Sequence, residues 1–175
     1  AGRAADATPR IDVVAGQELG DRRIARRQRL RAAERGDGTV AVAQALADAQ
    51  VPLAGVLTHA GESYGLNTAD ALAAAAEGER AAAVKAAENL RAAGFACPIV
   101  SVGSTPTAHF ARDLTGVTEV RAGVFMFFDL VMHGVGVCQL DDLAISVLAT
   151  VIGRKPDKGW LLIDAGWMAM SRDRG

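Results

Sequence analysis

Ser101-Val102-Gly103-Ser104-Thr105-Pro106-Thr107 is the stretch that decides the fold, because it joins a short apolar run to a segment that can open a helix. Residues 97–100 are apolar and partly β-branched, as in a buried strand, and residues 107–114 can form a helix. Gly103 lets a ligand approach the backbone closely. Ser104, Thr105 and Thr107 add hydroxyls beside the positive end of a helix dipole. The turn is therefore either a phosphate site or an ordinary Ser/Thr N-cap, and both interpretations stay open here.

Helical and strand-like segments alternate on either side of this turn. Upstream, residues 38–47 have apolar side chains at helical spacing and lead into the strand-like residues 53–57. An alanine-rich helix follows over residues 68–93, with Asn67 or Thr68 as its N-cap and Gly94 just past its end. A second strand, residues 98–102, and a third apolar segment, residues 117–128, complete the series.

This alternation predicts βαβ units with parallel strands, and therefore an α/β fold. A closed (β/α)8 barrel needs about 250 residues, so this chain of 175 has room for at most about half of one. We expect the C-terminal half of a TIM-like barrel running into the start of a β domain. In such a fold the functional residues lie at the carboxyl ends of the strands.

Two polar loops fall at those ends and should converge. The loop Thr58–Tyr64 follows the first strand, and the turn at Gly103–Thr107 follows the second. His59 can act as an acid or base or stack on a planar cofactor, and Tyr64 can donate a hydrogen bond to one. The alternative for His59 is a structural hydrogen bond. His109 and His133 are expected to be helix or surface residues.

The pattern changes near the C-terminus. Residues 142–152, 159–164 and 167–171 are strand-like, and the turn at residues 154–159 joins the first two. No helical pattern lies between them, so we expect a hairpin that begins a β domain.

The first 36 residues differ from the rest. They hold nine arginines, no lysine and five acidic residues, a formal charge of +4. Within them, residues 22–31 (RRIARRQRLR) have few apolar side chains to offset the entropy of ordering, so a solvated helix or a disordered arm is expected there. A basic helix for an anionic partner and an artefact of how the chain was delimited or translated are the alternatives.

Composition restricts the class of protein. Half of the residues are hydrophobic, 22% are charged and the net charge is −1, which does not point to nucleic acid or to an acidic membrane as a partner. No apolar run reaches the roughly 20 residues of a membrane span. The two cysteines, Cys97 and Cys138, lie in apolar stretches without metal-ligand spacing. Buried free thiols, and hence a cytoplasmic protein, are expected.

From residue 38 onward the chain resembles the D-threonine aldolase and D-serine dehydratase family, whose members are fold-type III pyridoxal-phosphate enzymes with an alanine-racemase-like barrel followed by a β domain. The aldolase branch resembles it most. The resemblance rests on five blocks in the family's order: THAGESYG (58–65), SVGSTPTA (101–108), LTGVTEVRAGVFMFFD (114–129), DDLAISVLATVIGR (141–154) and GWLLIDAGWMAMSRDRG (159–175). It implies a barrel part over residues 37–130 and the beginning of the β domain over residues 131–175.

The resemblance also implies roles for individual residues. His59 would lie near the face of the cofactor ring and take part in proton transfer, and Tyr64 would line the same pocket. The phosphate would be held by the turn, and residues 121–125 would contribute Gly123 and Phe125, where the family commonly has tyrosine in place of Phe125. The turn residues implied as phosphate ligands are Gly103, Ser104, Thr105 and Thr107.

Two family features, the Schiff-base lysine and the metal site, have no counterpart in this sequence. The family's Schiff-base lysine follows the first barrel strand, whereas Lys85 falls in the long helix, and Lys155 and Lys158 fall in the hairpin turn. A divalent metal, Mn, Mg or Zn, is expected only in an intact family member. Whether this chain is itself an enzyme therefore stays open.

The resemblance implies a fragment of a lyase that cleaves D-β-hydroxy-amino acids to glycine and an aldehyde. A D-serine-dehydratase-like lyase and a non-catalytic phosphate-binding remnant are the alternatives. The strand edges of a half-barrel favour poor solubility or self-association, with a homodimer as one outcome.

Overall fold

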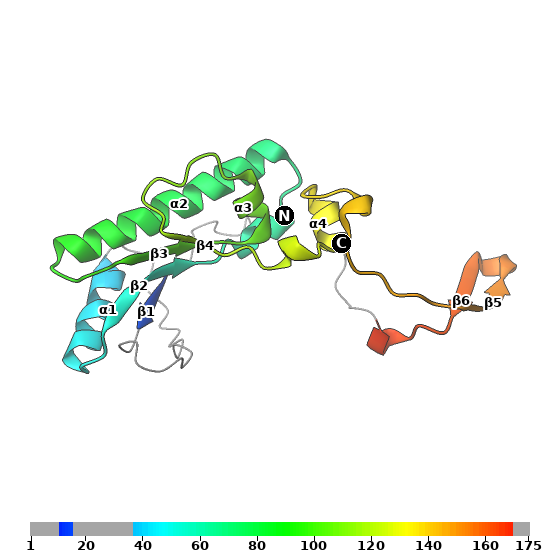
Figure 1. The fold of residues 1–175 in the computed structure, drawn as a ribbon, viewed down its shortest axis with the longest axis horizontal. Coiled ribbons are helices and arrows are strands. Elements are labelled where there is room, and N and C mark those ends of the chain that lie inside the picture. Colours follow the sequence, from blue (N-terminus) through cyan, green and yellow to red (C-terminus); the bar gives the residue numbers. More distant parts are fainter. Residues whose placement is uncertain (1–10, 16–36, 170–175) are drawn as a thin grey trace, which may run out of the picture. The chain divides into compact units, whose positions relative to one another are not determined.

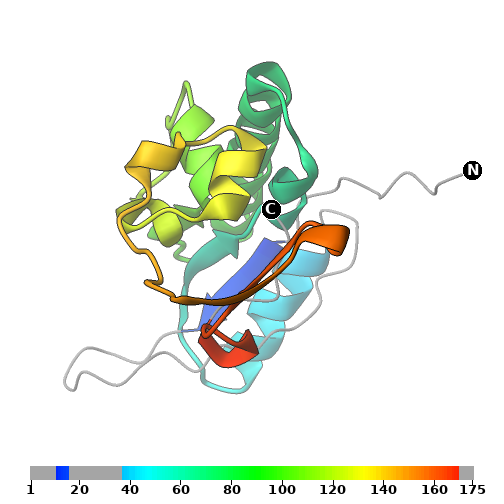
Figure 2. The same ribbon diagram turned by 90° about the vertical axis from the view of Figure 1, so that its right-hand side faces the viewer.

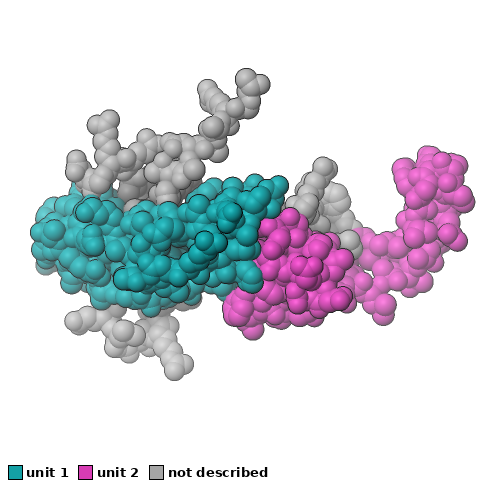
Figure 3. Space-filling view, turned by 90° about the horizontal axis from the view of Figure 1, so that it is seen from above, with its two compact units in different colours: residues 1–123 teal, residues 124–175 magenta. Residues whose placement is uncertain are grey.

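The computed structural model describes residues 11–15 and 37–169, which form two compact units. The first unit comprises residues 1–123 and the second residues 124–175, and Figure 3 shows them in different colours. Each unit is described by itself below.

The first unit contains a four-stranded sheet in the order β1-β2-β3-β4 (Figure 1). Its strands are β1 (Ile11–Ala15), β2 (Leu53–Thr58), β3 (Ile99–Val102) and β4 (Glu119–Val120). β2, β3 and β4 are parallel, with Val56 beside Val100 and Ser101 beside Glu119. The predicted α/β fold with parallel strands is confirmed.

Helices connect the parallel strands. α1 (Asp37–Asp48) precedes β2, α2 (Ala69–Ala92) joins β2 to β3, and α3 (Thr105–Phe110) lies between β3 and β4. α1 lies beside β1, and α2 runs along β2 and β3 (Figures 1 and 2). The expected helices before β2 and before β3 are therefore present.

Both predicted ends of α2 are confirmed. The Thr68 hydroxyl accepts a hydrogen bond from the Ala71 amide at 3.3 Å, which makes Thr68 the N-cap. Gly94 follows the last residues with a φ of +88°, a conformation that glycine adopts without a Cβ penalty.

The core of the first unit is the layer between α2 and the sheet. Val56, Val100 and Val102 point toward the helix, whose buried face contributes mainly alanines and Leu90. Alternation along a strand places Ser101 on the opposite face of β3. The sheet therefore has one apolar face, covered by helices, and a second face that carries polar side chains near the strand ends. The buried cluster consists of Ala43, Val56, Ala83, Ala86, Ala87, Leu90, Cys97, Val100 and Val102.

One prediction for the first unit needs correction, and the Arg-rich segment contains a strand that was not expected. Residues 11–15 form β1, which pairs antiparallel with β2, whereas residues 22–31, expected to be a helix or an arm, are not described. The sequence of β1, IDVVA, is β-branched, and the edge of β2 offers unpaired backbone groups. The other residues of that segment lie outside the described part. The third apolar segment, 117–128, yields only the two-residue strand β4, because a 3-10 turn (Val124–Met126) follows it in the second unit.

The second unit holds the predicted hairpin. β5 (Val151–Lys155) and β6 (Trp160–Ile163) pair antiparallel, and the 3-10 turn Pro156–Lys158 connects them. Gly159 closes the turn with a φ of +65°. Before the hairpin lie α4 (Leu130–Val135) and the 3-10 turn Leu140–Asp142, and after it the 3-10 turn Trp167–Ala169.

Strand was predicted too widely in this unit. Residues 143–150 carry no regular structure, although their sequence is apolar. Of the predicted segment 167–171, residues 167–169 form a 3-10 turn, and residues 170 and 171 lie outside the described residues. A strand needs a partner for its backbone groups, and the described ladder pairs only β5 with β6. The hairpin exposes its apolar side chains, with Ile152 at 67% and Leu161 at 58% of full exposure. The expected self-association stays a prediction.

None of the described helices is long and apolar enough to cross a membrane. The expected positions of two histidines are confirmed: His109 is exposed on α3, and His133 lies in α4 with its Nδ1 3.1 Å from the Cys138 carbonyl oxygen.

Both cysteines are free and buried, as predicted. Burial raises the pKa of the Cys97 thiol, and the Arg91 charge offsets part of this effect. Burial, together with the charges of Asp142 and Asp129, raises the pKa of the Cys138 thiol.

Because the thiolate is the reactive form of cysteine, we expect iodoacetamide to alkylate the folded chain more slowly than the urea-unfolded chain at pH 8. The alkylation rate of the folded chain should rise at higher pH. Mass spectrometry at timed intervals measures this, and identical rate profiles for the folded and unfolded chains would contradict it.

Candidate functional site

The two polar loops meet at the carboxyl ends of β2 and β3. His59 directly follows β2, and its Nδ1 lies 2.8 Å from the carbonyl oxygen of Gly103, which directly follows β3. A carbonyl oxygen can only accept, so Nδ1 carries the hydrogen and Nε2 is the unprotonated nitrogen of the neutral ring. The structural hydrogen bond considered for His59 is present, and it uses one ring nitrogen only.

His59 and Tyr64 lie at the exposed side of this rim. The His59 ring is exposed, Tyr64 is 38% exposed, and their ring centroids are 6.2 Å apart at a tilt of 44°. Because the Nδ1 bond fixes the imidazole, its Nε2 edge is held in a defined direction. These two side chains can present ring faces and polar atoms to a ligand.

The turn after β3 caps the N-terminus of α3 through Ser104. Ser104 precedes α3 in an extended conformation, and its hydroxyl accepts from the Thr107 amide at 3.3 Å. The Thr107 hydroxyl accepts in return from the Ser104 amide at 3.2 Å, which completes a capping box. Residues 101–107 are all buried. The N-cap interpretation is thus confirmed, while a phosphate role for Ser104, Thr105 and Thr107 stays a prediction.

Gly103 is required by its backbone neighbours. Its φ is +151°, and a Cβ placed on it would lie 2.2 Å from the Arg121 carbonyl oxygen. The Gly103 backbone therefore packs closely against the segment that follows β4. This packing constraint, which the sequence does not reveal, explains glycine at this position without a ligand.

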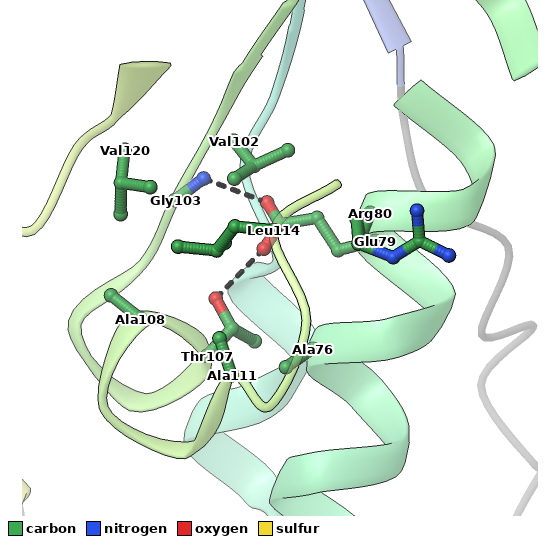
Figure 4. Close-up of a pocket in the computed structure, with 10 residues that line it drawn as sticks. All are labelled: Ala76, Glu79, Arg80, Val102, Gly103, Thr107, Ala108, Ala111, Leu114 and Val120. Carbon is green, nitrogen blue, oxygen red and sulfur yellow. Dashed lines mark hydrogen bonds between the residues drawn. The ribbon is translucent and has the colours of Figure 1, made fainter. Parts of the chain in front are cut away.

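Sequence reasoning missed Glu79, a residue of α2 that is only 2% exposed. Its carboxylate accepts hydrogen bonds from the Thr58 hydroxyl at 2.8 Å, the Gly103 amide at 3.0 Å and the Thr107 hydroxyl at 2.7 Å. Figure 4 shows Glu79 pointing from α2 toward Gly103 and Thr107 beside a small, mostly apolar cavity. An acidic residue in an alanine-rich helix offers only a weak sequence signal, since most such residues face solvent.

Ser63 was also missed. Its side chain is fully buried, its hydroxyl donates to the Ala60 carbonyl at 2.6 Å, and it lies 3.0 Å from the Ser104 hydroxyl. Ser63 therefore links the loop after β2 directly to the turn after β3.

A second polar group lies on the sheet face opposite α2. Arg121 Nε donates to the Ser101 hydroxyl at 2.8 Å, and an Arg121 terminal nitrogen donates to the Thr58 carbonyl oxygen. The Ser101 hydroxyl in turn donates to Glu119 at 2.5 Å. The alternating positions of Glu119 and Arg121 are the signal that could have identified this cluster, which places a guanidinium at the ends of β2 and β3.

The remaining predicted residues are not all brought together. Thr105 is the first residue of α3 and is 3% exposed. Gly123 ends the first unit, is exposed and, within the described part of the chain, has open space where a Cβ would lie. Phe125 belongs to the second unit, in the 3-10 turn Val124–Met126, and is 53% exposed.

The lysines of the described part lie on α2 and in the hairpin. Lys85 is exposed on α2 and pairs with Glu88 at 3.7 Å, and Lys158 stacks over the Trp160 ring at 4.9 Å within the hairpin. Among residues 11–15 and 37–169, no group of three or more His, Cys, Asp or Glu side chains could hold a metal ion.

A parallel sheet covered by helices, with polar loops meeting at its carboxyl ends, is the arrangement found in α/β proteins such as barrels, whose sites lie at the strand ends. Two family models match the chain: "Alanine racemase, N-terminal domain" over residues 34–131 and "Putative serine dehydratase domain" over residues 144–175. The chain belongs to this alanine-racemase-like family of fold-type III pyridoxal-phosphate proteins. The predicted family and the predicted partial barrel are therefore confirmed.

Two of the matching proteins are named as dehydratases of D-amino acids. The chain is 65% identical over 136 residues to D-threo-3-hydroxyaspartate dehydratase of Delftia sp., covering 78% of this chain and 36% of that protein. It is 34% identical over 125 residues to D-serine dehydratase of Dictyostelium discoideum, covering 69% of this chain and 32% of that protein. The chain thus spans about a third of the length of these relatives.

Two solved structures are also similar to this chain in fold and sequence. D-threo-3-hydroxyaspartate dehydratase from Delftia sp. superposes with a TM-score of 0.77 at 62% identity, covering 81% of this chain and 37% of that one. An alanine racemase-like protein from Idiomarina loihiensis superposes with a TM-score of 0.72 at 48% identity, covering 78% of this chain and 36% of that one. A cysteine-to-alanine mutant of the dehydratase has been solved in a metal-free form.

Proposed function

We propose that the chain is part of a pyridoxal-phosphate-dependent lyase of D-3-hydroxy amino acids and supplies one wall of its cofactor site. The observation that carries this proposal is the 65% identity to D-threo-3-hydroxyaspartate dehydratase across the segment that holds both polar loops. The relatives are named as dehydratases, which favours loss of the β-hydroxyl. Cleavage to glycine and an aldehyde, the aldolase reaction, stays a prediction that rests on the sequence blocks alone.

The described residues suit the ring of the cofactor better than they suit its phosphate. His59 and Tyr64 offer exposed rings on the rim, and Arg121 supplies a cation at the same strand ends. The Gly103 amide and the Thr107 hydroxyl, by contrast, already donate to Glu79. Gly123 and Phe125 stay proposed cofactor-binding residues by the resemblance alone.

Each side chain has a defined task in this proposal. The bound cofactor supplies an electron sink for bond breaking at Cα. His59 packs against the ring and, with Nδ1 fixed by Gly103, moves a proton at Nε2. Tyr64 closes the exposed side of the pocket. Ser104 and Thr105 hold the shape of the turn beside it.

The substrate class, partners and location follow the same reasoning. We propose a small D-3-hydroxy amino acid as the substrate, with neither nucleic acid nor a membrane as a partner, and a homodimer as the assembly to test first. The two buried free thiols support a cytoplasmic location. The divalent metal is proposed for the intact family member only.

Titration of the chain with pyridoxal phosphate, followed by absorbance and by equilibrium dialysis, tests the cofactor site. We expect saturable binding that is weaker for pyridoxal without its phosphate. Replacing His59 by Gln should weaken binding about 10-fold, since one ring contact worth about 1.4 kcal/mol is lost. The control is His109→Gln, an exposed residue that should leave affinity unchanged. Equal affinity of the wild-type chain and the His59 variant would count against the assigned role.

A second candidate function is favoured by the positions of the lysines. Lys85 lies on α2, and Lys155 and Lys158 lie in the hairpin of the second unit, so none of them directly follows a strand of the parallel sheet. A non-catalytic, ligand-binding remnant would therefore bind the cofactor without a covalent bond. Borohydride reduction and mass spectrometry test the remnant, because a lysine of this chain trapped on the cofactor would rule it out, whereas reversible binding fits both candidates.

A further inference from the structure

Glu79 is an unexpected residue for its surroundings. The buried face of α2 otherwise consists of leucine and alanine, and Glu79 is only 2% exposed among them. Burying a carboxylate is costly unless hydrogen bonds replace its water. Three hydrogen-bond donors take the place of water around the Glu79 carboxylate. All three come from outside α2: Thr58 at the end of β2, Gly103 after β3 and Thr107 in α3. One side chain therefore ties the helix to both polar loops.

The carboxylate also sets the direction of the neighbouring hydroxyls. Because it can only accept, the Thr107 hydroxyl donates to it and must accept from the Ser104 amide. Ser63 donates to the Ala60 carbonyl, so its oxygen is available to accept from the Ser104 hydroxyl. The hydroxyl hydrogens of Ser63 and Thr107 thus point into the protein.

Gly103 connects Glu79 to His59. The Gly103 amide donates to Glu79 at 3.0 Å, and the Gly103 carbonyl accepts from His59 Nδ1 at 2.8 Å. Fixing one polar backbone atom of Gly103 restricts the other, because only two backbone dihedrals separate them. The orientation of the imidazole therefore depends on a carboxylate that does not touch it.

We infer that Glu79 is a positioning residue of the cofactor site, which orients His59 through Gly103 and holds the Gly103 amide and the Thr107 hydroxyl away from the cofactor phosphate. The inference rests on the proposed function for the identity of the ligand. It reassigns Gly103 and Thr107 from phosphate ligands to internal supports. The phosphate is then held by other groups of the rim.

The test compares Glu79→Gln and Glu79→Met with Glu77→Gln, an exposed residue of the same helix that pairs with Arg80. Glutamine keeps an acceptor for Thr58 and Gly103, whereas methionine has similar volume and no comparable acceptor. Amide exchange of Gly103 and the ¹⁵N shifts of the His59 ring are measured by NMR on the 175-residue chain. A pyridoxal phosphate titration of each variant follows.

We expect Glu79→Met to speed exchange of the Gly103 amide at least about 10-fold, to reduce the population with hydrogen on Nδ1 of His59, and to weaken cofactor binding by a similar factor. Glu79→Gln should give values between those of Glu79→Met and the wild-type chain, because a neutral amide oxygen is a weaker acceptor than a carboxylate, and Glu77→Gln should match the wild-type chain. If Glu79→Met does not fold, partial loss of Gly103 protection in folded Glu79→Gln supports the inference, and wild-type protection overturns it.

The two proposals fail separately. A wild-type chain that binds no pyridoxal phosphate refutes the cofactor site, while the Gly103 and His59 signals still decide whether Glu79 orients the ring. Wild-type binding with unchanged Gly103 and His59 signals in folded Glu79→Met overturns the positioning role alone.

Discussion

Replacing Gly103 by Ala is expected to abolish cooperative folding of the first unit or to lower its stability by on the order of 3 kcal/mol. The added Cβ would lie 2.2 Å from the Arg121 carbonyl oxygen and 2.8 Å from the Arg121 amide nitrogen. These are backbone atoms of the strand-end segment paired to β3, so they cannot rotate away. The φ of +151° adds strain for any residue with a side chain.

The matched control is Gly94→Ala. Gly94 also has a positive φ, +88°, but within the described part of the chain nothing lies within 4 Å of the position that its Cβ would take. Only the backbone conformation is therefore penalised, by about 1 kcal/mol. Urea unfolding followed by circular dichroism measures both variants. Comparable losses for the two would mean that the approach of Arg121 to Gly103 is not close in solution.

The expected loss of stability on substitution of Gly103 affects how the cofactor site can be tested. From the sequence alone, Gly103→Asp is the natural change to abolish phosphate binding. With the Arg121 backbone so near, loss of binding in that variant would report loss of the fold. Substitutions of His59 and Glu79 are more informative, because each alters a defined hydrogen bond.

Replacing Leu90 by Ala is expected to destabilise the first unit by about 3 kcal/mol. Leu90 is fully buried between α2 and the sheet, near Val56 and Val100. Its helical neighbours on that face are alanines, among them Ala83, Ala86 and Ala87. Such small side chains cannot move to fill the space left by an isobutyl group, so most of the cavity would remain.

Leu114→Ala provides the comparison. Leu114 has the same chemistry but is 46% exposed, so its truncation should cost about 1 kcal/mol. Denaturant midpoints at constant slope give the difference. If both variants lost equal stability, the packing of α2 on the sheet would not be the main source of stability in this unit.

The helices and the parallel strands could be predicted because their signals are local. Apolar spacing identified α1 and α2, and Thr68 and Gly94 marked the ends of α2. The turn of the hairpin was equally clear from its Lys, Pro, Asp and Gly residues. Residues 143–150 misled the prediction because an apolar run describes a preference for burial, whereas a strand also requires a partner.

The site could be predicted only in part, for a related reason. The loops that hold His59 and Gly103 were expected at one rim, and the hydrogen bond between them agrees with this. Glu79 lies 24 positions before Gly103 and 21 after Thr58, and no spacing rule joins these three residues. Only the packing of α2 across the sheet brings the carboxylate to both loops.

The antiparallel pairing of β1 has a consequence for assembly. β1 lies along the outer edge of β2, with Ile11 beside Thr58, where a closed barrel of parallel strands requires a parallel neighbour. A polypeptide that supplied such a neighbour would compete with β1 for the same backbone groups. Joining this chain to the rest of a barrel is therefore an exchange of strands, whose rate depends on how readily five residues detach from an edge.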